Sequence, residues 1–135
     1  MYLLIFMIFF CYVVLITGGY QSGGGHTVQI FNPITKKSCS LPELPEDRHH
    51  HSEDGGLLCG GPASTNTSDT CVQWSPTSGT WNHSHTLTQW RYGHVSWATP
   101  SGVYLIGGVY NSRTSERVKL DGSVEEGFSL KNNTM

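Results

Sequence analysis

The chain has 135 residues and a formal net charge of −2, with 8 Lys and Arg residues against 10 Asp and Glu residues. Without any long run of basic residues, this balance argues against a phosphate-binding face, so neither nucleic acid nor an anionic membrane surface is an expected partner. Sixteen glycines among many Ser, Thr and Asn residues predict many turns and few long helices, while four Trp, six Tyr and five Phe provide the packing that a disordered chain lacks.

The first sixteen residues, MYLLIFMIFFCYVVLI, carry no charge. Such a run is typical of a signal peptide or a short membrane anchor, although it is shorter than the ~18 apolar residues that usually span a bilayer. No basic residue follows Met1 and no A-x-A-like cleavage site follows Ile16, so a buried β-strand within 13–19 is the alternative. We expect residues 1–17 to be a signal-like segment that overlaps a first strand. The chain is then secreted, and contacts a membrane only if the segment stays uncleaved and anchors it.

Cysteines and glycosylation sequons also indicate an extracellular protein. Cys11 lies in the apolar run, and Cys39, Cys59 and Cys71 follow it without the paired spacing of a zinc site. A disulfide is chemically reasonable in a secreted chain. Three N-x-S/T sequons are candidate glycosylation sites, at Asn66, Asn82 and Asn132.

An internal repeat is the main pattern in the sequence. An apolar run precedes a glycine pair three times, and the pairs are Gly18 and Gly19, Gly60 and Gly61, and Gly107 and Gly108. A shift of 43 positions places Val28 on Cys71, Phe31 on Trp74, Pro33 on Pro76, Leu44 on Leu87, Arg48 on Arg91 and His51 on His94. Because chance rarely aligns so many large or special residues, we expect repeat units near residues 13–47, 48–90 and 91–130, followed by a tail at 131–135.

Each unit is predicted to form short antiparallel strands. The run before each glycine pair suits a buried strand, and the glycines then allow a turn or a close backbone approach. A polar loop follows at 20–27, 62–70 or 109–116, and a second strand comes next at VQIF, CVQW or RVKL. After a turn at NPIT, SPTSG or DGS, a third strand lies around Trp81 or Phe128, and a fourth begins near Arg48 or Arg91. Four strands per period make one blade of a β-propeller.

The order of these residues resembles the kelch repeat. The resemblance rests on Arg91, His94, VYLIGG and Val118, on CVQWSPTSGTW with Leu87 and Arg91 after it, and on ITGG, VQIFNPIT and LPELP before Arg48. It covers residues 13–130, and the sequence is also similar to invertebrate kelch proteins that are expected to be extracellular. The resemblance implies an all-β fold, a partial kelch-type β-propeller made of four-stranded antiparallel blades.

The sequence departs from the repeat in two respects. Ser38 stands where the middle unit has Trp81, and the third unit offers Phe128 as the substitute for that Trp. Two full periods with flanking strands also fall short of the ~4–8 blades of a closed propeller. We therefore expect two to three blades that belong to a longer propeller, an assembly or a truncated product, and a product without function is one alternative.

Cys59 ends one predicted strand and Cys71 opens the next, so antiparallel pairing would bring them within bridging distance. The sequence predicts a disulfide between them, with two small buried thiols as the alternative, and leaves Cys39 unpaired or bonded elsewhere.

The histidine run 49–51 has the composition of a metal site, but adjacent residues of a strand point to opposite faces, so we expect no metal there. Since His51 recurs as His94, we expect this position to tie one blade to the next by hydrogen bonds. Arg48 recurs as Arg91, so we expect a buried or half-buried arginine bonded to carbonyls or a carboxylate, with an anion-binding residue as the alternative.

No catalytic motif is recognisable. The sequence lacks a G-x-S-x-G elbow, a G-x-x-x-x-G-K-[ST] phosphate loop and a recognisable carboxylate pair for acid–base work. We expect no catalytic, cofactor or metal site, and instead a non-catalytic module that recognises a protein or a glycan through the loops at 20–27, 62–70 and 109–116. The enzymatic alternative is part of a secreted copper-oxidase-like propeller, whose His, Tyr and Cys groups would converge from several blades.

Overall fold

The computed structural model describes residues 13–19, 25–61, 69–109 and 113–131, and within these ranges it contains strands and no helix. The strands are β1 (Val14–Thr17), β2 (Val28–Asn32), β3 (Lys37–Ser40), β4 (Ser52–Asp54), β5 (Leu57–Cys59), β6 (Thr70–Ser75), β7 (Thr80–Thr86), β8 (Val95–Thr99), β9 (Gly102–Ile106), β10 (Thr114–Val118) and β11 (Val124–Ser129). No helix in the described part of the chain is long and apolar enough to cross a membrane.

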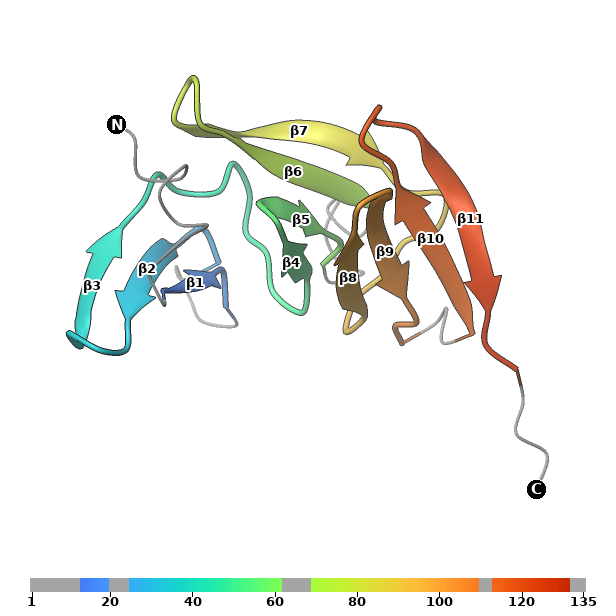
Figure 1. The fold of residues 1–135 in the computed structure, drawn as a ribbon, viewed down its shortest axis with the longest axis horizontal. Helices are drawn as coiled ribbons and strands as arrows, with labels where there is room; N and C mark the ends of the chain where they lie inside the picture. Colours follow the sequence, from blue (N-terminus) through green and yellow to red (C-terminus); the bar gives the residue numbers. More distant parts are fainter. Residues whose placement is uncertain (1–12, 20–24, 62–68, 110–112, 132–135) are drawn as a thin grey trace.

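The strands form three antiparallel sheets in chain order. The first sheet is β1-β2-β3, the second is β4-β5-β6-β7, and the third is β8-β9-β10-β11. Figure 1 shows the sheets side by side, with β1–β3 at one side and β8–β11 at the other. The fold is therefore all-β, built from blade-like sheets whose successive strands are antiparallel neighbours, as local hairpin connections favour.

Local turn chemistry explains two of the hairpins. Between β2 and β3, Asn32 Oδ1 accepts hydrogen bonds from the backbone N–H of Ile34 at 2.9 Å and of Thr35 at 3.0 Å, which is an Asx turn. Between β6 and β7, Gly79 has a φ of 66° and its N–H donates to the Ser75 carbonyl at 2.8 Å. The second turn sets the register of β6 with β7, which aligns Trp74 with Trp81, whose rings lie 5.5 Å apart.

The hydrophobic core lies between successive sheets, because alternate residues of a strand face opposite neighbours. Leu58 of β5 packs toward the first sheet, in a cluster whose buried members are Val28, Leu44, Leu58, Val72 and Trp81. Leu57 and Cys59 of the same strand pack toward the third sheet, in a cluster whose buried members are Leu57, Cys59, Cys71, Leu87, Leu105 and Val118. The second sheet is thus covered on both faces.

The glycine pairs connect each sheet to the next. Gly19 N–H donates to the Arg48 carbonyl at 3.0 Å, and Gly61 N–H donates to the Arg91 carbonyl at the same distance. Two features require glycine at position 60. It has a φ of 76°, and a Cβ there would overlap the Arg91 carbonyl oxygen and lie 2.6 Å from His94 Cε1.

The third sheet corrects two predictions. The loop expected at 109–116 and the strand expected at RVKL are misplaced, because β10 begins at Thr114 and ends at Val118. Phe128 is not the substitute for Trp81. The register pairs Val118 with Val124 where the second sheet pairs Trp74 with Trp81, while the Phe128 side chain is 43% exposed. Continuing the 43-residue shift from Trp81 leads to Val124, so the sequence contained this answer.

Candidate functional site

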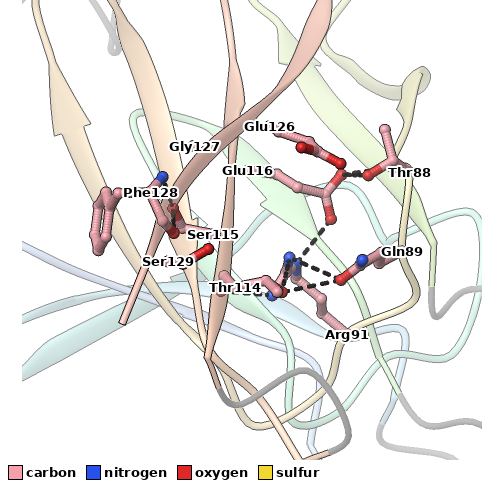
Figure 2. Close-up of a pocket in the computed structure, with 10 residues that line it drawn as sticks. All are labelled: Thr88, Gln89, Arg91, Thr114, Ser115, Glu116, Glu126, Gly127, Phe128 and Ser129. Atoms are coloured by element: carbon pink, nitrogen blue, oxygen red, sulfur yellow. Dashed lines mark hydrogen bonds and ion pairs between the residues drawn. The ribbon is translucent and has the colours of Figure 1, made fainter. Parts of the chain in front are cut away.

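Arg91, in the segment that precedes β8, makes several hydrogen bonds through its guanidinium group. Its Nη1 donates to the carbonyls of Gly107 at 2.8 Å and Thr114 at 3.0 Å, and its Nη2 donates to Thr114 Oγ1 at 2.8 Å. Nη2 also reaches Gln89 Oε1 at 3.4 Å, and Nε donates to Glu116 Oε1 at 2.8 Å. All five N–H groups of the guanidinium therefore have acceptors, as Figure 2 shows in part.

Glu116 completes this arrangement as a buried counter-ion. Its side chain is only 1% exposed, and its Oε2 accepts from Thr88 N–H at 2.6 Å and from Thr88 Oγ1 at 2.8 Å. A buried carboxylate needs such a set of donors, because water is not available to solvate it. The Arg91–Glu116 pair joins β10 to the segment that precedes β8.

A small cleft adjoins this ion pair. Its volume is about 70 Å³, and its lining, drawn in Figure 2, consists of Thr88, Gln89, Arg91, Thr114, Ser115, Glu116, Glu126, Gly127, Phe128 and Ser129. Pockets that bind drug-sized molecules usually exceed roughly 300 Å³, so this cleft has room for water rather than for a substrate. The polar groups here hold strands together.

Arg48 occupies the same place in the second sheet. Its Nη1 donates to the carbonyls of Gly60 at 2.8 Å and Thr70 at 2.9 Å, and its Nη2 donates to Thr70 Oγ1 at 2.8 Å. The carboxylate differs, because Nη2 pairs with Glu46 at 3.0 Å, whose side chain is 34% exposed. Burial is the main cause that lowers the pKa of Arg48, and Glu46 opposes it.

The two arginines therefore brace the bases of two loops. Gly60 N–H bonds to the Thr70 carbonyl and Gly107 N–H bonds to the Thr114 carbonyl, each at 3.0 Å, so each loop closes beside its arginine. The first sheet closes its loop in the same way, with Gly18 N–H bonded to the Thr27 carbonyl at 2.8 Å.

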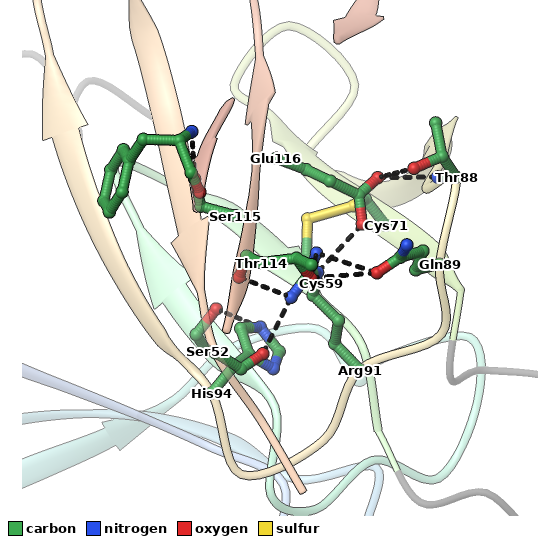
Figure 3. Close-up of polar contacts among 12 residues, drawn as sticks. Ser52, Cys59, Cys71, Thr88, Gln89, Arg91, His94, Thr114, Ser115 and Glu116 are labelled. Atoms are coloured by element: carbon green, nitrogen blue, oxygen red, sulfur yellow. Dashed lines mark hydrogen bonds and ion pairs between the residues drawn. A yellow bond between two sulfur atoms is a disulfide. The ribbon is translucent and has the colours of Figure 1, made fainter. Parts of the chain in front are cut away.

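His51 and His94 link successive sheets. His51 Nε2 lies 2.8 Å from Thr17 Oγ1 in β1, and His94 Nε2 lies 2.7 Å from Ser52 Oγ in β4, as Figure 3 shows for the second pair. The buried Nδ1 of each ring has no hydrogen-bond partner in the described structure. Burial first, and the neighbouring arginine next, lower the pKa of both histidines to about 4, so both rings are neutral at pH 7.

The predicted disulfide is present, between Cys59 at the end of β5 and Cys71 in β6. The two residues are directly paired across the strands, and their Cα atoms are 4.1 Å apart. The bridge, drawn in Figure 3, closes the base of the loop that Arg48 braces. Cys39 is a free, exposed thiol in β3.

The other residues predicted from the sequence differ in their exposure. Trp81 is buried and Trp74 is half-buried against the first sheet. Asn82 is exposed on β7, where a glycan has access, whereas Asn66 and Asn132 lie outside the described residues. Most of the three predicted binding loops also lies outside them, at 20–24, 62–68 and 110–112.

Within the described ranges, no group of three or more His, Cys, Asp or Glu residues is placed to hold a metal ion. The histidines of the 49–51 run diverge. The His49 and His50 rings lie edge to face at 5.0 Å, while His51 turns toward β1.

Sequence reasoning missed the carboxylates and threonines around the arginines. Glu46 aligns with Gln89, and Thr27 with Thr70, under the same 43-residue shift that aligns the arginines, so that shift could have found them. Glu116 had no such signal, because it was assigned to a loop.

No protein-family model matches the chain, and no curated protein matches it at a significant level.

Proposed function

We propose that the chain is a kelch-type β-propeller segment that binds an extracellular protein or glycan, without catalysis, through the loops that follow its glycine pairs. One observation carries this proposal. In all three sheets, the glycine that ends the apolar strand bonds to the first residue of the next strand or its neighbour, so the three loops leave equivalent points of three neighbouring sheets. Loops arranged in this way on a rigid scaffold can form one continuous binding surface.

The chemistry around these loops favours recognition rather than reaction. The segments 20–27, 62–69 and 109–113 are rich in Ser, Thr, Asn and Gly, and the only fixed charges in them are Asp69 and Arg113. Such side chains offer hydrogen bonds to hydroxyl groups or to peptide groups. The charges of Arg48 and Arg91 would otherwise attract an anionic ligand. Both side chains instead donate hydrogen bonds to carbonyls and carboxylates of the chain itself.

The disulfide supports an extracellular setting, because cystine bridges persist in oxidising compartments. The exposed Asn82 sequon is consistent with this setting, and its glycosylation is part of the proposal.

The test replaces the loop centre 63–67 with Gly and Ser residues at constant length. The Cys59–Cys71 bridge and the Arg48 hydrogen bonds lie at the loop base and remain in place. The matched control replaces residues 76–78 in the β6–β7 turn, which leaves the opposite end of the same strand. Wild type and both variants are screened on a printed glycan array and on an array of secreted ectodomains.

We expect a ligand that binds wild type and the turn variant, but binds the loop variant at least tenfold more weakly. A ligand that binds all three proteins equally contradicts recognition through this loop. Turnover of a bound glycan or ectodomain contradicts the non-catalytic assignment.

A further inference from the structure

Three leucines hold the same place in three sheets and differ in exposure. The backbone N–H of each leucine donates to a carbonyl that lies shortly before β2, β6 or β10. Leu44 N–H donates to the His26 carbonyl at 2.9 Å, Leu87 N–H to that of Asp69 at 2.6 Å, and Leu130 N–H to that of Arg113 at 2.7 Å. Leu44 is 3% exposed and Leu87 is 5% exposed, because the following sheet covers each of them. Leu130 is 41% exposed, since no described residue covers the third sheet there.

The same face of the third sheet carries an aromatic cluster. Trp97 stacks on Tyr104 with ring centroids 6.0 Å apart, and the Phe128 ring centroid lies 6.1 Å from that of Tyr104. Trp97 is 59% exposed and Phe128 is 43% exposed. Arg117 of β10, which pairs with Glu125, lies over the Tyr104 ring on the same face, 5.7 Å from the ring centroid. Exposed aromatic groups of this kind on a surface usually mark an interaction site.

The sequence repeat indicates that a further sheet would cover this face of the third sheet. Tyr104 and Ile106 stand before Gly107 as Leu57 and Cys59 stand before Gly60. Leu57 and Cys59 are buried by the sheet that follows them. The outer face of the third sheet therefore has the same residue pattern as the face of the second sheet that the third sheet covers.

The opposite end of the molecule presents a second apolar face. In β1, Leu15 and Thr17 point toward the second sheet, where Leu15 packs against the core and Thr17 bonds to His51. Val14 and Ile16 alternate with them and are 49% and 48% exposed on the outer side of the sheet. Figure 1 shows the first and third sheets at the two ends of the row of sheets.

We propose that the chain associates head to tail with a second copy of itself. The outer face of the third sheet (Trp97, Tyr104, Phe128 and Leu130) packs on the outer face of the first sheet (Val14 and Ile16) of the second copy. The two faces differ, so the contact is heterologous, and two such contacts close a ring of two chains. That ring would hold six sheets, which lies within the ~4–8 blades of closed propellers. This inference does not depend on ligand binding by the loops, and it requires Val14 and Ile16, which lie within the signal-like segment 1–17, to be retained in the chain.

The test measures the mass of the full chain by analytical ultracentrifugation at up to roughly 100 µM, where a Kd near 10 µM populates the dimer. Wild type is compared with Leu130→Glu, Ile16→Lys and the matched control Leu120→Glu. Leu120 is 83% exposed in the β10–β11 turn, away from both faces.

We expect wild type and Leu120→Glu to be dimers, and Leu130→Glu and Ile16→Lys each to weaken association at least tenfold. A mixture of these two variants should dimerise again, because one contact pairs Glu with Lys and the other is unchanged. Restoration in the mixture also shows that each variant is folded.

Three outcomes overturn the proposal. The first is a wild-type chain that stays monomeric over this range, which would leave the face to another partner. The second is a dimer that Leu130→Glu does not weaken. The third is the formation of open oligomers longer than two chains, because they exclude the closed ring.

Discussion

The Arg48 and Arg91 sites each hold a buried guanidinium group at the same position of the repeat, but the carboxylates that pair with them differ. Both guanidinium groups are buried, and both donate to the carbonyl of the glycine that ends a strand and to a threonine that begins the next strand. Arg91 is neutralised by Glu116, which is fully buried, whereas Arg48 uses Glu46 at a half-exposed edge. The second sheet has Val72 where the third has Glu116.

This difference shows which part of the repeat is constrained. The backbone acceptors recur because they belong to the strand ends, which the fold supplies in every unit. The carboxylate can come from two places, because an arginine has donors on three nitrogen atoms and charge balance needs only one nearby partner. Val72 instead contributes to the core between the first and second sheets.

The largest expected effect separates the two carboxylates. Glu116→Ala leaves Arg91 buried without its counter-ion, and we expect a loss of about 3–5 kcal/mol in the free energy of unfolding. Glu46→Ala also leaves a buried arginine without its carboxylate, but Glu46 is 34% exposed and water screens the pair, so we expect a smaller loss of about 1–2 kcal/mol. Urea denaturation of both variants measures the comparison. Equal losses would show that burial of the carboxylate does not distinguish the two sites.

The glycines at the arginine carbonyls give the next effect. Gly60→Ala forces a Cβ against the Arg91 carbonyl and also carries the cost of a positive φ, so we expect a loss of about 2–4 kcal/mol. Gly79 is the matched control, because its φ of 66° is similar and nothing lies within 4 Å of its Cβ position.

Gly79→Ala should cost only the conformational part, about 1–2 kcal/mol. Thermal and urea unfolding of the two variants, measured side by side, give the difference. If Gly79→Ala is as destabilising as Gly60→Ala, the close approach between the sheets carries no weight.

The smallest effect is a pH dependence that both arginine sites share. His51 and His94 have pKa values of about 4 in the folded chain, against about 6.5 in an unfolded one. The unfolded state therefore binds more protons between these values. The stability from the neutral rings is complete above pH 6.5 and is lost as the pH falls from 6.5 toward 4.

We expect each histidine to account for a loss of about 1–2 kcal/mol between pH 7 and pH 5. His94→Gln, which does not titrate, should remove that share of the pH dependence, and His51→Gln should remove a similar share. Urea unfolding at pH 7, 6 and 5 provides the measurement. A wild-type stability that is flat over this range would contradict neutral, buried rings.

Several features of the fold were predictable because they depend on neighbours in sequence. Short apolar runs and turn residues located most strands, and direct pairing of two strand ends placed Cys59 against Cys71. The errors arose where these local signals were weak. Polar residues in TSERV concealed the start of β10, and an exposed Phe128 was taken for a core aromatic.

The sequence by itself determined the all-β class, the repeat positions of the glycine pairs and arginines, and the placement of Cys59 opposite Cys71. Only the tertiary structure decided which carboxylate neutralises each arginine and which face of each sheet is covered. The physical reason is distance along the chain. Glu46 is two residues from Arg48, whereas Glu116 is 25 residues from Arg91 and is placed beside it by the pairing of β10 with β9.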